Sequence, residues 1–178
     1  KAAALCELIL AESRRIIRRR RATLIVETHH GFVCANAGID SSNTATGSVI
    51  LLPRDPDASA RRLQAPLADV AGGRVGVVVC DTHGRACRRG LVNVAIGVAG
   101  FEAVEDHRGT RDREGRVLVA TEQAIADELA AASGLLMPKG GGTPAVLFSG
   151  VSTTPSPGGA AALIRDPEHD LFRGSTAD

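Results

Sequence analysis

Three segments of the chain gather the oxygen-bearing and charged side chains that bind metal–phosphate ligands. The first covers residues 36–43, which hold one carboxylate, two side-chain amides and several hydroxyls, with no bulky side chain to block access. This composition suits a ligand site built around Asp40. It equally suits a loop whose side chains satisfy their own backbone groups in an Asx turn. The residues alone leave both interpretations open.

The second segment covers residues 81–85 and follows the apolar run 74–80, which is typical of a strand covered on both faces. We therefore expect Asp81 in a loop directly after a buried strand, with the hydroxyl of Thr82 beside it. Carboxylate and hydroxyl oxygens suit magnesium or manganese, which keep several waters and share their remaining ligands with phosphates. The alternative is that Asp81 only caps the following turn.

The third segment covers residues 138–144 and combines Lys139 with three consecutive glycines. Glycines let backbone N–H groups approach a phosphate closely, and Lys139 adds positive charge. The segment is not a Walker A loop, because the required spacing is absent and the glycines precede an expected strand. Asp127 and Glu128 on the expected helix before it are a further candidate, with a buried ion pair as the alternative role of Glu128. The absence of a G-x-S-x-G motif and of a convincing Cys/His pair favours a metal–phosphate site over nucleophilic acyl transfer.

The composition excludes several classes of protein. A length of 178 residues fits one domain or two small subdomains, and a net charge of +1 argues against nucleic acid or an anionic membrane as the main partner. Four Phe without Trp or Tyr are too few for stacking bases. The four cysteines show no C-x-x-C pair, which argues against zinc and favours a reduced, cytoplasmic protein. No membrane-length apolar run or signal peptide is visible in the sequence.

The elements that position the three segments follow from apolar periodicity and turn residues. We expect helices over residues 2–19, 55–67, 121–136 and 160–164, and strands over residues 23–26, 32–35, 48–52, 74–80 and 145–148. The mixed order predicts an α+β fold with mixed or antiparallel sheets and packed helices. We expect a core over residues 1–151, with two interleaved subdomains as a variant, and a linker and C-terminal tail over residues 152–178. The arginines between residues 14 and 21 indicate a solvated helix end, or alternatively a site for an anion or a partner subunit.

Several longer strings add a resemblance to a known family. The strings CANAGIDSSN (34–43), LLPRDPDASARRL (51–63), VVVCDTHGRACRRG (77–90), VAIGVAG (94–100), IADELAA (125–131) and GTPAVLFSG (142–150) resemble the coenzyme F-420 gamma-glutamyl ligase family. They occur in the family's order and spacing from about residue 2 to about residue 173. The first and third strings are the most specific.

This resemblance implies a GTP-dependent ligase that joins L-glutamate to the carboxylate at the end of the deazaflavin precursor's phospholactyl tail. The γ-phosphoryl group of GTP would pass to that carboxylate, and the glutamate amine would attack the acyl phosphate. By resemblance, Asp40 and Asp81 are the catalytic and metal-binding aspartates, and Thr82 is an adjacent hydroxyl ligand. The implied nucleotide contacts are Asn43, Met137, Lys139, Gly140, Gly141 and Gly142. The implied cofactor is magnesium or manganese, as one or two ions, with a monovalent cation as a further candidate, in an intertwined homodimer.

The chain also departs from the family pattern. It begins at Lys1 without Met, and relatives carry an N-terminal segment of several dozen residues that contacts the nucleotide, so we expect a segment to precede it. Lys139 stands where some relatives have an acidic or amide metal ligand, so the resemblance leaves the second metal's ligands open. Two alternative functions remain: a non-catalytic family remnant, or an amide ligase acting on a different carboxylate. The number of glutamates added, and whether a flavin domain follows residues 165–173, stay open.

Overall fold

The computed structural model describes residues 3–170 and has an α+β fold, as predicted. Its sheets are antiparallel: β1 (Ser13–Arg20), β2 (Thr23–Thr28) and β3 (Val33–Ala35); β4 (Val77–Gly84) and β5 (Leu91–Ala99); β6 (Glu105–Asp106) and β7 (Glu122–Gln123). The α-helices are α1 (Ala3–Ala11), α2 (Pro56–Ala71) and α3 (Ile125–Ser133). The 3₁₀-helices are η1 (Asn36–Gly38), η2 (Ala160–Leu163) and η3 (Pro167–His169).

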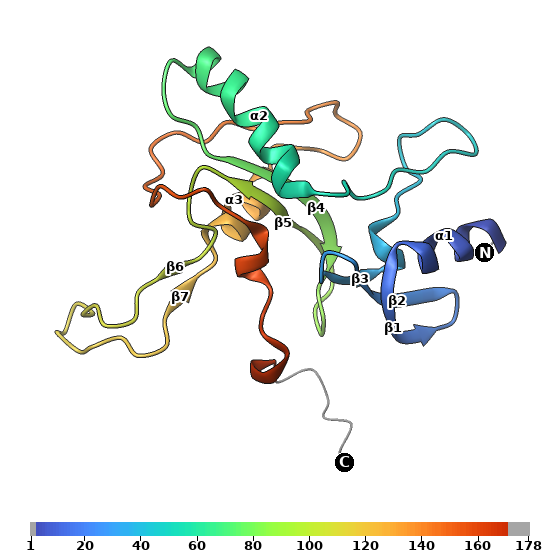
Figure 1. The fold of residues 1–178 in the computed structure, drawn as a ribbon, viewed down its shortest axis with the longest axis horizontal. Helices are drawn as coiled ribbons and strands as arrows, with labels where there is room; N and C mark the ends of the chain where they lie inside the picture. Colours follow the sequence, from blue (N-terminus) through green and yellow to red (C-terminus); the bar gives the residue numbers. More distant parts are fainter. Residues whose placement is uncertain (1–2, 171–178) are drawn as a thin grey trace.

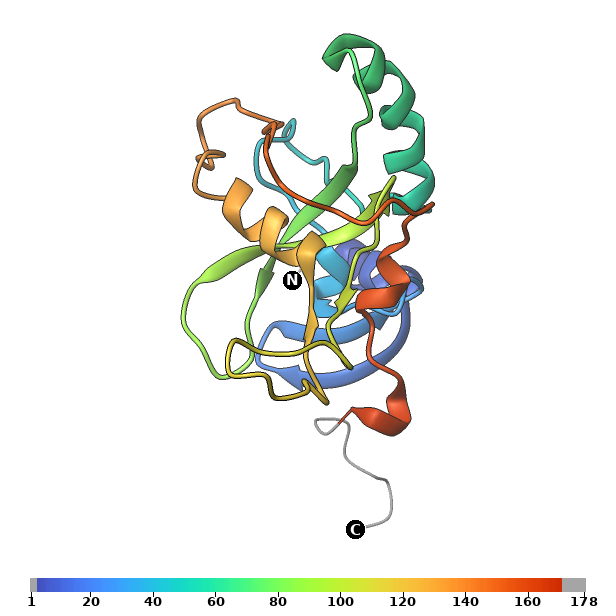
Figure 2. The same cartoon turned by 90° about the vertical axis from the view of Figure 1, so that its left-hand side faces the viewer.

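The long β4–β5 hairpin lies at the centre of the molecule, between α2 and α3 (Figures 1 and 2). Successive side chains of a strand point to opposite faces, so the hairpin can be covered on both sides. Val78 of β4 packs in the cluster that contains Ala126 of α3, whereas Val77 packs in the cluster that contains Ala60 of α2. The apolar run before Asp81 is therefore covered on both faces, as its composition predicts.

The start of α2 is defined by local sequence and then anchored by long-range contacts. Asp55 caps the helix by accepting a hydrogen bond from the Ala58 amide at 2.7 Å, and a proline occupies the first turn. Asp57 Oδ1 accepts hydrogen bonds from the amides of Val98, at 2.8 Å, and Ala160, at 3.0 Å. One carboxylate thus joins α2 to β5 and η2. Within residues 3–170, no helix combines the length and apolar character needed to cross a membrane.

The predicted helix over residues 2–19 is wrong beyond Ala11. The chain turns there and forms β1, which pairs antiparallel with β2. Arg15 forms an ion pair with the buried carboxylate of Glu27 on β2, with 2.8 Å between Arg15 Nη2 and Glu27 Oε2. The arginines on β1 therefore lie on a sheet edge, and the interpretation of the cluster as a solvated helix end is wrong.

Other predicted elements differ in extent. The hairpin of β2 and β3 is confirmed, whereas residues 48–52 form only an isolated bridge between Ile50 and Asp40, and residues 145–148 form no strand. The helix predicted over residues 121–136 is shorter, because Glu122–Gln123 pairs with β6 instead. A short apolar run becomes a strand only where a partner strand is available, and local sequence does not supply that information.

Candidate active site

The strand β4 continues through the residues that were expected to form a loop. Asp81, Thr82 and His83 all pair with β5, and Thr82 lies opposite Asn93. Because side chains alternate along a strand, Asp81 and His83 share one face of β4 and Thr82 points to the other. The prediction of a loop at Asp81 is therefore wrong, and the strand directs the two adjacent side chains to different sides.

A chain of hydrogen bonds orients the Thr82 hydroxyl. Thr82 Oγ1 donates to Asn93 Oδ1 at 2.9 Å, and Asn93 Nδ2 donates to Ser133 Oγ at 3.4 Å. Ser133 Oγ in turn donates to the Ala130 carbonyl at 2.7 Å. Because the Thr82 hydroxyl donates its proton to Asn93, the lone pairs of its oxygen remain available to contact a cation. Asn93 and Ser133 were missed from the sequence, since nothing in their local pattern distinguishes them from core residues.

Lys139 brings the three sequence segments together. Its ammonium donates a hydrogen bond to Thr82 Oγ1, across 57 positions of the sequence. Its backbone carbonyl accepts from Asn43 Nδ2 at 3.3 Å, across 96 positions. The segments around Asn43, Thr82 and Lys139 therefore meet in one place, as a common metal–phosphate site requires.

Asp40 is ionised and lies in an Asx turn. Its carboxylate accepts from the Ser42 hydroxyl at 2.6 Å and from the Ser42 amide at 2.8 Å. The hydrogen bond from the Ser42 side chain, then that from its backbone, lowers the pKa of Asp40, and the charge of Lys139 adds to the effect. The two interpretations of this segment are thus compatible: the turn satisfies its own backbone and also holds a charged carboxylate near Lys139.

Asp81 faces His83 rather than capping a turn. Asp81 Oδ2 and His83 Nε2 are 3.4 Å apart, and the Asp81 side chain retains 29% of its accessible surface. The Asp81 carboxylate is therefore accessible to a ligand, whereas the side chain of His83 on the same face is only 13% exposed. The alternative that Asp81 only caps a turn is wrong. Asp81 also affects a neighbouring thiol: burial, followed by the charge of Asp81, raises the pKa of Cys34 to about 11.

The glycine segment is an open turn beside Lys139. The Gly141 amide donates to the Pro138 carbonyl at 2.9 Å, and a Cβ at Gly141 would meet Pro138 Cγ at 2.3 Å, so a larger residue would force the proline ring or the turn to shift. Nothing lies within 4 Å of a Cβ built at Gly140 or Gly142. Met137 is partly buried, and the three glycines are exposed. The turn thus offers unobstructed backbone to a ligand on the Lys139 side.

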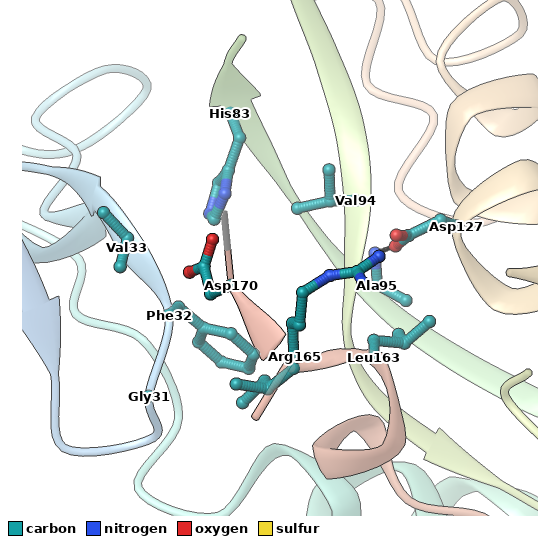
Figure 3. A pocket seen from close by; sticks show the side chains of 11 residues that line it. Gly31, Phe32, Val33, His83, Val94, Ala95, Asp127, Leu163, Arg165 and Asp170 are labelled. Atoms are coloured by element: carbon teal, nitrogen blue, oxygen red, sulfur yellow. Dashed lines mark hydrogen bonds between the residues drawn. The ribbon is translucent and has the colours of Figure 1, made fainter. Parts of the chain in front are cut away.

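A cavity of about 250 Å³ adjoins the His83 side of β4. In Figure 3 the His83 ring points toward Asp170, and Arg165 extends toward Asp127. Asp127 Oδ1 accepts a hydrogen bond from the Ala95 amide at 2.8 Å, which ties α3 to β5. The lining is mixed polar and apolar: Gly31, Phe32, Val33, His83, Val94, Ala95, Asp127, Leu163, Ile164, Arg165 and Asp170.

Glu128 lies outside this arrangement. Its side chain is exposed and accepts a hydrogen bond from Gln123 Nε2 at 2.8 Å. The interpretation of Glu128 as a buried ion-pair partner is therefore wrong.

The donor set suits a hard divalent cation that shares its ligands with a phosphate. It comprises the carboxylates of Asp40 and Asp81, whereas the Thr82 hydroxyl lies on the other face of β4 and accepts from Lys139. Within the described part of the chain, no three His, Cys, Asp or Glu side chains gather as a metal cluster. Two carboxylates would leave most of the coordination shell to phosphate oxygens and water, as magnesium and manganese commonly require.

Known proteins match most of this chain. Residues 1–150 match the model of the F420-0:Gamma-glutamyl ligase family. The chain is 47% identical to the coenzyme F420:L-glutamate ligase of Methanothermobacter thermautotrophicus over 173 residues, which is 96% of this chain and 69% of that protein. It is 46% identical to the enzyme of the same name from Methanopyrus kandleri, over 94% of this chain and 68% of that protein. The chain therefore belongs to the F420-0:Gamma-glutamyl ligase family.

Proposed function

We propose that this protein ligates L-glutamate to the deazaflavin precursor of coenzyme F420, with GTP as the source of energy. The names of the relatives support the ligation of glutamate. The observation that carries the phosphate chemistry is the meeting of Asn43, Thr82 and Lys139 beside an open glycine turn. A site of this kind combines backbone N–H groups, an ammonium and hard oxygen donors, which suits a nucleoside triphosphate.

The proposed reaction has two steps. In the first, a carboxylate oxygen of the precursor attacks the γ-phosphorus of GTP, the bond to the bridging oxygen breaks, and GDP leaves. In the second, the glutamate amine attacks the acyl carbon, a C–N bond forms, phosphate leaves and the amine loses a proton. The first step needs alignment and charge neutralisation more than covalent help from the protein.

The side chains divide these tasks between two faces of β4. Asp40 and Asp81 would hold magnesium or manganese, which when bound would neutralise phosphate charge. Thr82 and Lys139 face the glycine turn, where Asn43 holds the Lys139 backbone. On the opposite face, His83 lies against Asp81 and would restrict the orientation of its carboxylate.

We also propose that the protein acts in the cytoplasm as a homodimer. The outer side of α2 supports a partner, because Leu63, Leu67 and Val70 are 49%, 44% and 88% exposed. These residues recur at helical spacing and form an apolar stripe that a second chain would cover. Sedimentation analysis at micromolar protein concentration tests the dimer.

The test of the activity is a glutamylation assay with the deazaflavin precursor, glutamate, GTP and manganese, followed by mass spectrometry. We expect a product one glutamate heavier than the precursor, formed with release of GDP and phosphate. Asp81→Ala should lower the rate by about 100-fold, because an essential charged ligand is lost. Asp69→Ala is the matched control, since Asp69 is an exposed carboxylate on α2, and should leave the rate unchanged.

Three other outcomes would contradict the proposal. Turnover only with a different carboxylate acceptor would assign another amide ligase activity. Product with ATP but not with GTP would overturn the nucleotide assignment. No turnover from this chain, or from a version extended at its N-terminus, would favour a non-catalytic family member.

A further inference from the structure

The ammonium of Lys139 occupies the place where a cation would bind Thr82. It donates to the same Thr82 oxygen that a metal would use, while the Thr82 proton is committed to Asn93. A hydroxyl whose proton is held in this way presents its lone pairs outward, which is the arrangement needed to receive a cation. Lys139 therefore acts on Thr82 as a bound cation would.

The backbone around Lys139 is positioned to bring its ammonium to Thr82. Asn43 donates to the Lys139 carbonyl, and the adjacent turn is closed by the hydrogen bond from Gly141 to Pro138. The pKa of Asp40 is lowered mainly by the hydrogen bonds from Ser42, and the positive charge of Lys139 adds a smaller effect. One ammonium thus contacts Thr82 and also acts on Asp40.

The choice of lysine is itself informative. Of the 21 basic residues, only Lys1 and Lys139 are lysines, and the other 19 are arginines. An ammonium is a compact, rotatable point charge, whereas a guanidinium is a wide planar fork. The chain has its only lysine among residues 3–170 at the position where a small spherical charge contacts a single hydroxyl oxygen.

We propose that the Lys139 ammonium is a built-in cation of the active site, which fills the cation position at Thr82 and excludes a metal ion from it. The inference rests on the proposed function for its biological meaning. A divalent ion is then required only at the carboxylates of Asp40 and Asp81. The ammonium stays at Thr82 whether or not a metal ion is bound.

The test is a titration of the purified protein with Mn²⁺ alone, in which electron paramagnetic resonance measures the free ion. Lys139→Met removes the charge and keeps the length of the side chain, so we expect Mn²⁺ to bind about tenfold more tightly than to the wild type. Lys139→Arg keeps the charge and should bind Mn²⁺ within twofold of the wild type. Lys139 is exposed, so neither variant should disturb folding.

A double variant locates the effect. In Lys139→Met combined with Thr82→Val, the gain in Mn²⁺ affinity should disappear, because the second substitution removes the hydroxyl oxygen that the first one leaves free. Unchanged or weaker Mn²⁺ binding by Lys139→Met would overturn the inference, as would a gain that survives the loss of Thr82. The titration uses no nucleotide or precursor, so a protein without ligase activity would refute the proposed function and leave this result standing.

Discussion

Thr82 Oγ1 donates a hydrogen bond to Asn93 Oδ1 at 2.9 Å across the β4–β5 hairpin. This bond determines how the hydroxyl presents its lone pairs, and it makes the contact between Thr82 and Lys139 depend on a residue in a different segment. Asn93 is itself held by Ser133 at the end of α3. The orientation of Thr82 therefore reports on the packing of α3 against the hairpin.

Asn93→Val should lower the glutamylation rate by about tenfold and the free energy of unfolding by about 1 kcal/mol, because Thr82 loses its acceptor. Thr82→Ser is the matched control and should retain most of the rate, since it keeps the hydroxyl. Steady-state assays and urea unfolding measure the two effects. Wild-type turnover by Asn93→Val would contradict the role of this bond.

Gly97→Ala should destabilise the protein by about 1–3 kcal/mol, because its Cβ would meet the Pro56 carbonyl oxygen at 2.3 Å. The start of α2 would then move away from β5. Gly73→Ala is the control, since nothing lies within 4 Å of its Cβ. Urea unfolding compares the two variants, and equal stabilities would show that α2 and β5 are not in such close contact.

Asp57→Ala should lower the free energy of unfolding by about 2 kcal/mol, because the amides of Val98 and Ala160 lose their acceptor. Hydrogen exchange should accelerate at both amides, which a general loss of helix α2 alone would not produce at Ala160. The exposed Asp69→Ala variant should match the wild type in both measurements. Unchanged exchange at Ala160 would mean that η2 is held by other contacts.

The Cys34 thiol should resist modification in the folded protein. It is 8% exposed, and burial raises its pKa from the ordinary value of 9.0 to about 11. A thiol reagent at pH 8 should therefore label the exposed Cys87 quickly and Cys34 only after unfolding. Fast native labelling of Cys34 would show that its environment is open.

The same raised pKa makes stability depend on pH. The contribution of the neutral Cys34 thiol is fully present below about pH 9, where the unfolded thiol is also protonated, and it is lost as pH rises toward about 11. The free energy of unfolding should fall across this window. In Cys34→Ala the free energy of unfolding should fall less steeply between pH 9 and pH 11. An equal slope in both proteins would assign the pH dependence to other groups.

The elements that sequence predicted best are those whose signals are local. The hairpin of β2 and β3 formed as expected, and α2 begins at the Asp55 cap and the proline that mark it. These features depend on backbone preferences and side-chain bonds within a few residues, which any sequence displays directly.

The element that sequence predicted least well is the arginine-rich segment after Ala11. Ile16 and Ile17 fit a helical period, but they are β-branched and lie on a strand. The buried carboxylate of Glu27 lies beside this strand, 12 positions from Arg15 along the sequence. A contact over that distance outweighs a weak local preference, and periodicity cannot reveal it.

The sequence by itself determined the α+β class, the oxygen-rich segments around Asp40 and Asp81, and the family, because residue types and their order are local properties. Only the tertiary structure decided that Thr82 and Asp81 point to opposite faces of β4 and that Lys139 reaches Thr82. It also revealed Asn93 as the residue that orients the Thr82 hydroxyl. These relations depend on which strands pair and in what register, and register is selected by the packing of the whole core.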